Sequence, residues 1–152
     1  MTKRYLFFIS QDYSFSVLRP LQKEMLLRGD EVVWFLYGDE LHYDFLHSNE
    51  KRVSSIDEVI EFNPHAVFVP GNVVPSFIPA LKVEVFHGLP SAKVTKSGQL
   101  YHFIIREMFD LYCTQGLSST GEFSRLSNLY KTFSVVETGW SKLDPLFEHQ
   151  NH

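Results

Sequence analysis

The chain has 152 residues, enough for one domain with a sizeable core. Its hydrophobic (44%) and charged (21%) fractions are typical of a soluble globular protein, and its net charge of −4 argues against general nucleic-acid binding, which needs a basic surface. Cys113 is the single cysteine, so an intrachain disulfide is excluded and a reducing compartment fits. No apolar run approaches the roughly 18 residues of a membrane span or the length of a signal-peptide core, so we expect a cytoplasmic protein.

The beginning of the chain predicts a β-α-β unit, the building block of a parallel sheet. Tyr5–Ile9 is a continuous apolar run, the pattern of a strand buried on both faces. A helix is expected over Ser16–Arg28, capped by its first residue and stopped by Gly29, with Pro20 tolerated in its first turn. A second buried strand is expected over Val32–Tyr37.

The rest of the chain continues this alternation. Leu41–Asn49 is ambiguous between a short helix and an irregular segment, and the proline-rich stretch 70–79 is not expected to form a regular helix. Capping-box spacings predict a short helix after Ser55 and a longer one over Glu122–Tyr130, with Ser119 as its cap. Further strands are expected over Ala66–Val69, Val83–Phe86, Phe109–Cys113 and Phe133–Val136. The pattern predicts an α/β fold with a Rossmann-like, mainly parallel sheet and helices on both faces.

Several polar residues and glycines directly follow the predicted strands. Because parallel strands end at the same edge of a sheet, we expect these residues to line one edge. They are Asp12, Gly38, Asn72, His87 and Gly116.

His87 is the most informative of them. It ends a predicted strand and is followed by Gly88 and Pro90, which turn the chain sharply. Ligands of open α/β sheets bind outside the carboxyl ends of the strands, and an imidazole, with an unperturbed pKa of about 6.5, exchanges protons near neutral pH. Position alone supports two interpretations equally: an acid–base residue, or a histidine whose ring only bonds a neighbouring backbone group.

Familiar phosphate-binding motifs are absent or incomplete. The turn after the first strand lacks the Gly-x-Gly-x-x-Gly of dinucleotide sites. The segment from Gly116 to Gly121 has the glycine spacing of a P-loop, but Glu122 replaces the phosphate-binding lysine. The hydroxyls of residues 118–120 at this helix start could hold an anion, although ordinary helix capping is the favoured interpretation.

Neither a metal nor a cofactor is expected. His42 and His47 are five residues apart, a spacing that does not place them on one helical face, and His-Glu-x-x-His and cysteine-pair motifs are absent. No Gly-x-Ser-x-Gly elbow offers a serine nucleophile. Cys113 lies inside an apolar run and is expected to be buried rather than reactive.

Three stretches in sequence order resemble the CDP-glycerol glycerophosphotransferase family, enzymes of glycosyltransferase-B architecture that build teichoic-acid-like cell-envelope polysaccharides. Val-Phe-His-Gly-Leu-Pro (85–90) is similar to a strand that ends in His-Gly-Thr-Pro, and Phe-Asp-Leu-Tyr-Cys-Thr-Gln-Gly (109–116) to the strand and turn that follow. Thr-Gly-Trp-Ser-Lys-Leu-Asp (138–144) resembles the closing Thr-Gly-x-Pro-Arg-x-Asp. Leu89, Ser141 and Lys142 depart from the threonine, proline and arginine of the family, and these departures concern the substrate more than the fold.

The resemblance implies one half of a glycosyltransferase-B architecture. His87 would be the catalytic base that deprotonates an acceptor hydroxyl, and Gly88 would let substrate phosphates approach the backbone. The other candidate substrate-binding residues lie at the same predicted edge or at the helix start after it. They are Asp12, Asn72, Gly116 and Ser118.

The resemblance also sets an expectation for domains and partners. Residues 1–147 would form the acceptor-side domain, and 148–152 a frayed tail or the start of a linker to a second domain that holds most of the nucleotide donor. The partners would be that donor and a polyol or saccharide acceptor, with peripheral contact at the inner face of the cell membrane through a lipid-linked acceptor. We expect the chain by itself to be inactive. The alternative is a non-catalytic α/β module that binds a small ligand or a partner through the same edge.

Overall fold

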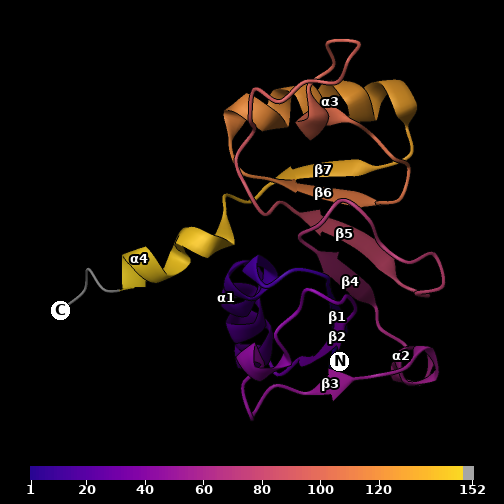
Figure 1. The fold of residues 1–152 in the computed structure, drawn as a ribbon, viewed down its shortest axis with the longest axis vertical. Coiled ribbons are helices and arrows are strands. Elements are labelled where there is room, and N and C mark those ends of the chain that lie inside the picture. Colours follow the sequence, from indigo (N-terminus) through magenta and orange to yellow (C-terminus); the bar gives the residue numbers. More distant parts are fainter. Residues whose placement is uncertain (149–152) are drawn as a thin grey trace.

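The computed structural model describes residues 1–148 and contains one parallel sheet of seven strands, in the order β3-β2-β1-β4-β5-β6-β7 (Figure 1). The strands are β1 (Arg4–Ile9), β2 (Glu31–Leu36), β3 (Arg52–Val53), β4 (Ala66–Val69), β5 (Leu81–Val85), β6 (Leu111–Thr114) and β7 (Ser134–Glu137). The α-helices are α1 (Tyr13–Leu27), α2 (Ile56–Phe62), α3 (Leu117–Tyr130) and α4 (Asp144–Glu148). The predicted α/β, Rossmann-like fold is confirmed.

The order of the strands reverses between β1 and β4. From β1 the chain builds outward to β2 and β3, and from β4 it builds the other way to β7. Parallel crossovers are right-handed, so the two directions place their connections on opposite faces of the sheet. Accordingly α1 covers one face, whereas α2 and α3 cover the other, as Figure 1 shows.

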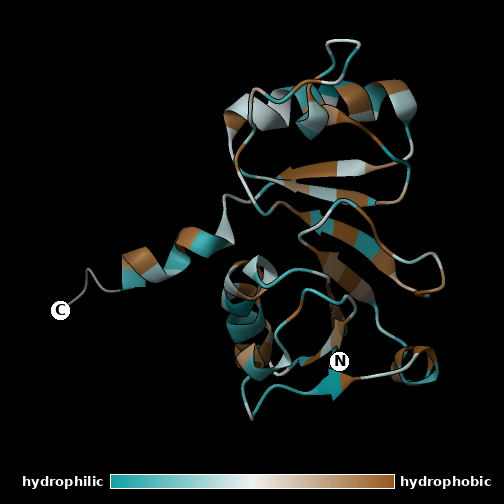
Figure 2. Ribbon diagram, viewed as in Figure 1, coloured by the Kyte–Doolittle hydropathy of each residue, from teal (hydrophilic) through white to brown (hydrophobic). Residues whose placement is uncertain are grey.

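Each face of the sheet packs its own hydrophobic core, as expected for strands that are apolar on both sides. Phe7 and Trp34 point to the α1 face, whereas Leu6 and Phe123 belong to the core on the opposite face, and all of them are fully buried. Apolar residues accordingly concentrate in the strands and on the inner sides of the helices (Figure 2). Because both cores hold the strands in place, the loops that follow the strands are fixed along the carboxyl edge of the sheet.

The first helix begins earlier than predicted. It starts at Tyr13, and Ser16 is not its cap, because the Ser16 hydroxyl donates to the Tyr13 carbonyl at 2.9 Å. Pro20 therefore lies inside the helix, where it removes one backbone hydrogen bond, and not in the first turn. Gly29 does end the helix as predicted, with a positive φ of 82° that a glycine adopts easily.

The two predicted capping boxes have different outcomes. Ser55 caps α2 as expected, since its hydroxyl accepts from the Glu58 N–H at 3.2 Å. The box predicted at Ser119 is wrong, because α3 starts earlier, at Leu117. The Ser119 hydroxyl instead donates to the Gly116 carbonyl at 3.1 Å, and this hydroxyl is buried within the first turn.

Two connections on the α2–α3 face contain no α-helix. The stretch 70–80 between β4 and β5 is irregular, as its prolines predict, and buries Val74 and Ile78 against the sheet. The stretch 86–110 between β5 and β6 contains a small hairpin closed by an antiparallel bridge between Val94 and Leu100. The region 41–49 is also irregular apart from a short 3-10 turn.

After β7 the chain returns to the α1 face. The Ser141 hydroxyl donates to the Val17 carbonyl at 2.6 Å, and α4 lies beside α1 in Figure 1. Phe147 and Glu148 are the last residues of α4, and the rest of the predicted frayed tail, 149–152, lies outside the described residues. Among residues 1–148, no helix is long and apolar enough to cross a lipid bilayer.

Candidate functional site

His87 lies two residues beyond the end of β5, the strand next to β4, and its ring reaches the point between β1 and β4 where the strand order reverses. Its Nδ1 is 2.8 Å from the carbonyl oxygen of Pro70, in the turn after β4. Its ring packs on that of Tyr13, directly after the β1 turn, with centroids 4.8 Å apart. The prediction that His87 lies beside the turns after β1 and β4 is confirmed, and this crevice is where ligands bind in doubly wound sheets.

The hydrogen bond to Pro70 fixes the state of the His87 ring. A carbonyl oxygen can only accept, so Nδ1 must carry the proton that it shares with Pro70. In the neutral imidazole Nε2 then has a free lone pair, and the ring cannot turn without losing the bond. The structure thus shows the backbone bond of one interpretation, at Nδ1, whereas the acid–base interpretation stays a prediction that would use Nε2 of this exposed side chain.

Tyr13 supports this ring from the other side. It belongs to the first turn of α1, and partial burial raises the pKa of its phenol, which stays protonated at neutral pH. A neutral aromatic ring against an imidazole restricts its motion without adding charge. Tyr13 therefore acts on the orientation of the His87 ring.

The three stretches on which the family resemblance rests meet at His87. Gln115, after β6, donates its side-chain N–H to the Gly88 carbonyl at 2.8 Å. Trp140, after β7, donates its indole N–H to the Phe86 carbonyl at 3.0 Å. The residues on both sides of His87 are thus held by side chains that follow the next two strands of the sheet.

A polar cavity of about 190 Å³ opens beside His87. We call it the His87 cavity. Its polar and glycine lining, besides His87 itself, consists of Asn72, Gly88, Ser91, Lys93, Tyr101 and His102. Two predicted substrate-binding residues, Asn72 and Gly88, are therefore brought together with the predicted base.

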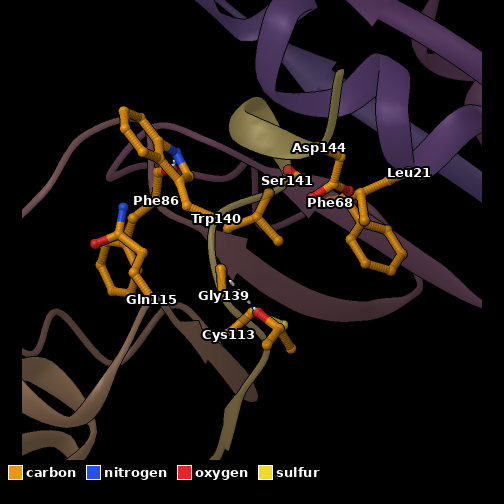
Figure 3. A pocket seen from close by; sticks show the side chains of 11 residues that line it. Leu21, Phe68, Phe86, Cys113, Gln115, Gly139, Trp140, Ser141 and Asp144 are labelled. Carbon is orange, nitrogen blue, oxygen red and sulfur yellow. Dashed lines mark hydrogen bonds between the residues drawn. The ribbon is translucent and has the colours of Figure 1, made fainter. Parts of the chain in front are cut away.

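A second cavity of about 200 Å³, the Trp140 cavity, lies on the other side of Phe86, between α1 and the segment that leads away from β7. Its wall is largely apolar, with Leu21 and Phe68 opposite Trp140 in Figure 3. The side-chain oxygen of Gln115 is buried there and has no partner among residues 1–148. Asp144 lies at the rim, and its pKa is raised by partial burial and by neighbouring acidic groups.

Asp12 lies at the predicted edge but uses its carboxylate within the protein. One oxygen accepts from the His42 N–H at 2.9 Å and the other lies 2.5 Å from His42 Nδ1. These bonds to the His42 backbone and ring lower the pKa of Asp12, and the Asp12 carboxylate in turn raises the pKa of His42. The predicted substrate-binding role of Asp12 thus competes with an existing ion pair.

The remaining two predicted residues, Gly116 and Ser118, do not line the His87 cavity. Gly116 precedes α3, and its carbonyl accepts from the hydroxyl of Ser119. Ser118 lines a different cavity, together with Glu122 and residues of the hairpin. The Thr120 hydroxyl donates to the Glu137 carboxylate at 2.5 Å, so an acidic group already lies at the start of this helix, where an anion would otherwise be favoured.

Cys113 lines the Trp140 cavity but is not activated as a nucleophile. Burial raises the pKa of the Cys113 thiol to about 11, so it is a thiol and not a nucleophilic thiolate at neutral pH. No group of three or more histidine, cysteine, aspartate or glutamate side chains within residues 1–148 could hold a metal ion.

Sequence reasoning missed the residues that come from irregular segments. The early start of α1 brings Tyr13 to the site. The long connection between β5 and β6 brings the other three, Lys93, Tyr101 and His102. Neither segment has a periodic pattern. Gln115 and Trp140 were within the quoted motifs, but only the folded chain shows that both bond the backbone around His87.

Comparison with protein-family models, with curated proteins and with solved structures finds no match to this chain.

Proposed function

We propose that this chain is the acceptor-side domain of a glycerophosphotransferase-like enzyme. The enzyme would transfer a glycerol-phosphate, polyol-phosphate or sugar group from a nucleotide to a hydroxyl of a surface polysaccharide. The observation that carries the proposal is the His87 ring, whose Nδ1 is committed to Pro70 and whose Nε2 is free at the reversal point of the sheet. The family resemblance and the convergence of its three stretches on His87 support the same assignment.

In the proposed reaction, Nε2 takes the proton of an acceptor hydroxyl while that oxygen attacks the donor. For a glycerol-phosphate donor, the new bond joins the acceptor oxygen to phosphorus, and the bond from phosphorus to the bridging oxygen breaks. The nucleotide leaves as a monophosphate that carries the bond electrons. The imidazolium formed on His87 keeps its bond to Pro70 through the step and later releases its proton to water.

The departures from the family pattern fall on residues around this site. Leu89 is exposed at the His87 cavity, Ser141 bonds the Val17 carbonyl, and the Lys142 ammonium lies 5.5 Å from the Trp140 ring centre. Ser141 and Lys142 therefore have local structural partners, whereas Leu89 faces the cavity. By this placement, Leu89 is the departure that would change which acceptor fits.

The test is His87→Asn in the proposed enzyme, in which this domain is joined to a second, donor-binding domain. Asparagine keeps an N–H that can bond Pro70 but removes the free ring nitrogen, so turnover from CDP-glycerol to a polymer primer should fall about 10²–10⁴-fold. The melting temperature and the KM for the donor should not change, because the donor is held mainly by the second domain. His47→Asn, at an exposed histidine of the β2–β3 connection, is the matched control and should leave turnover unchanged.

Two results would count against catalysis by His87. Normal turnover with a normal melting temperature would remove it from the mechanism. A lower melting temperature with activity lost only in proportion to unfolding would leave it a structural residue. Either result favours the alternative of a non-catalytic module that binds a ligand or partner at this edge.

A further inference from the structure

We propose that the His87 cavity is a phosphate-binding site, in which Lys93, Ser91 and Tyr101 hold a phosphate group next to His87 and His102. The proposal goes beyond the transfer reaction, since it requires only a phosphate group, whichever molecule carries it. It rests on the chemistry of the lining, on the way the connection between β5 and β6 positions that lining, and on the pair of imidazoles at its base.

The lining offers hydrogen-bond donors and positive charge. Lys93 contributes an ammonium group, Ser91 and Tyr101 contribute hydroxyls, and Asn72 contributes an amide. No acidic side chain of residues 1–148 lines the cavity, and Lys93 forms no ion pair with any carboxylate in the described part of the chain. In a protein of net charge −4, a cavity with this lining selects an anion.

The connection between β5 and β6 holds these groups in place. The Tyr101 N–H donates to the Lys93 carbonyl at 2.9 Å, and the antiparallel bridge between Val94 and Leu100 closes the hairpin beyond them. The Lys93 ammonium lies 5.1 Å from the centre of the Tyr101 ring, a cation–π contact between two residues of the cavity lining.

The imidazoles give the cavity its second feature. The His102 ring packs on Phe86 at 4.6 Å and against Phe123 at 5.6 Å, and its Nε2 is buried with no partner among residues 1–148. Burial lowers the pKa of His102, and the proximity of His87 lowers it further. An anion in the cavity would offset this repulsion and favour the protonated form of His102.

The experiment is a histidine-ring NMR titration of the full chain at fixed ionic strength, with inorganic phosphate, sn-glycerol 3-phosphate and glycerol as probes, and each titration is repeated over a series of pH values. Both phosphates should shift the His87 and His102 resonances saturably and raise the measured pKa of His102. Glycerol, which has the same hydroxyls without the charge, should shift neither ring.

Two variants of equal net charge distinguish specific phosphate binding in the cavity from nonspecific electrostatic attraction to the hairpin. Lys93→Gln should weaken phosphate binding at least about tenfold, as expected for loss of one charge-assisted contact. Lys96→Gln removes a lysine from the same hairpin that does not line the cavity, and it should bind phosphate as the wild type does. Equal melting temperatures would show that both variants fold.

Absence of saturable shifts with either phosphate, or equal weakening by the two lysine substitutions, would overturn the site. That failure is distinguishable from failure of the proposed transfer. The turnover assay depends on Nε2 of His87, whereas this titration depends on Lys93 and needs no donor and no second domain.

Discussion

The two faces of the sheet are built differently. On the α1 face, a helix that satisfies its own backbone hydrogen bonds covers a core in which Phe7 and Trp34 pack edge-to-face, 5.0 Å apart. On the opposite face, irregular connections cover part of the sheet, and rings fill the space, with Phe123 in contact with Phe86 and Tyr112. That second face also buries the carboxyl of Glu84.

This difference explains where the candidate site lies. A helical crossover leaves its polar groups paired and its loops short, whereas an irregular crossover exposes backbone and side chains that can serve a ligand. The connection between β5 and β6 supplies most of the polar lining of the His87 cavity, and its inner side rests on the aromatic core. We therefore interpret the α1 face as a scaffold and the opposite face as the support of the candidate site.

The largest expected effect tests this division directly. Phe123→Ala and Trp34→Ala each remove a fully buried ring, one from each core, and each should cost about 3–5 kcal/mol of unfolding free energy. Only Phe123→Ala should also change the histidine-ring NMR spectrum of His87 and His102, because Phe123 packs on His102 and Phe86. Equal spectral changes in the two variants would contradict the division between scaffold and site-bearing face.

The next effect concerns Glu84, which is 4% exposed, in the middle of β5. Burial raises the pKa of this carboxyl to about 8 although the Arg106 charge opposes the shift. Below pH 4.5 the Glu84 carboxyl is protonated in both the folded and the unfolded chain. Between that pH and about 8 the unfolded chain is ionised while the folded chain keeps its proton, so stability should fall by about 1.4 kcal/mol per pH unit.

Glu84→Gln removes the carboxyl that titrates differently in the folded and unfolded chains. The unfolding free energy of this variant should therefore not decrease between pH 4.5 and 8 as that of the wild type does. Denaturant titrations at several pH values measure the slope for each variant. Glu61→Gln, at an exposed position of α2, is the matched control and should keep the slope of the wild type. An unchanged slope in Glu84→Gln would show that another group controls the pH dependence.

The smallest effect is local to one helix of the second face. Ser55→Ala removes the side-chain acceptor for the Glu58 N–H at the start of α2 and should cost about 1 kcal/mol. Ser119→Ala removes a donor to the Gly116 carbonyl inside the first turn of α3, where no orphan N–H depends on the hydroxyl. Thermal unfolding of the two variants should therefore show a capping loss for Ser55 only, and a restoring Ser55→Thr variant should recover most of it.

The sequence by itself determined the architecture of this protein. Strands that are apolar on both faces, separated by capped helical segments, can only be buried in a covered parallel sheet, and so β1, β2 and β4 were predicted within a residue of their observed bounds. Parallel strands end at one edge, so the position of His87 beside the turns after β1 and β4 also followed from the pattern. These features depend on local periodicity and on the handedness of crossovers.

Only the tertiary structure decided the details of the site. The helices α1 and α3 begin earlier than predicted, and the bonds of Asp12 to His42 and of Ser119 to Gly116 are not visible in a capping pattern. The Pro70 carbonyl that fixes the His87 tautomer is 17 residues away in sequence, and Lys93 and His102 line the cavity from a connection without periodicity. Contacts between distant irregular segments have no local signature, since they arise only when the sheet brings the loops together.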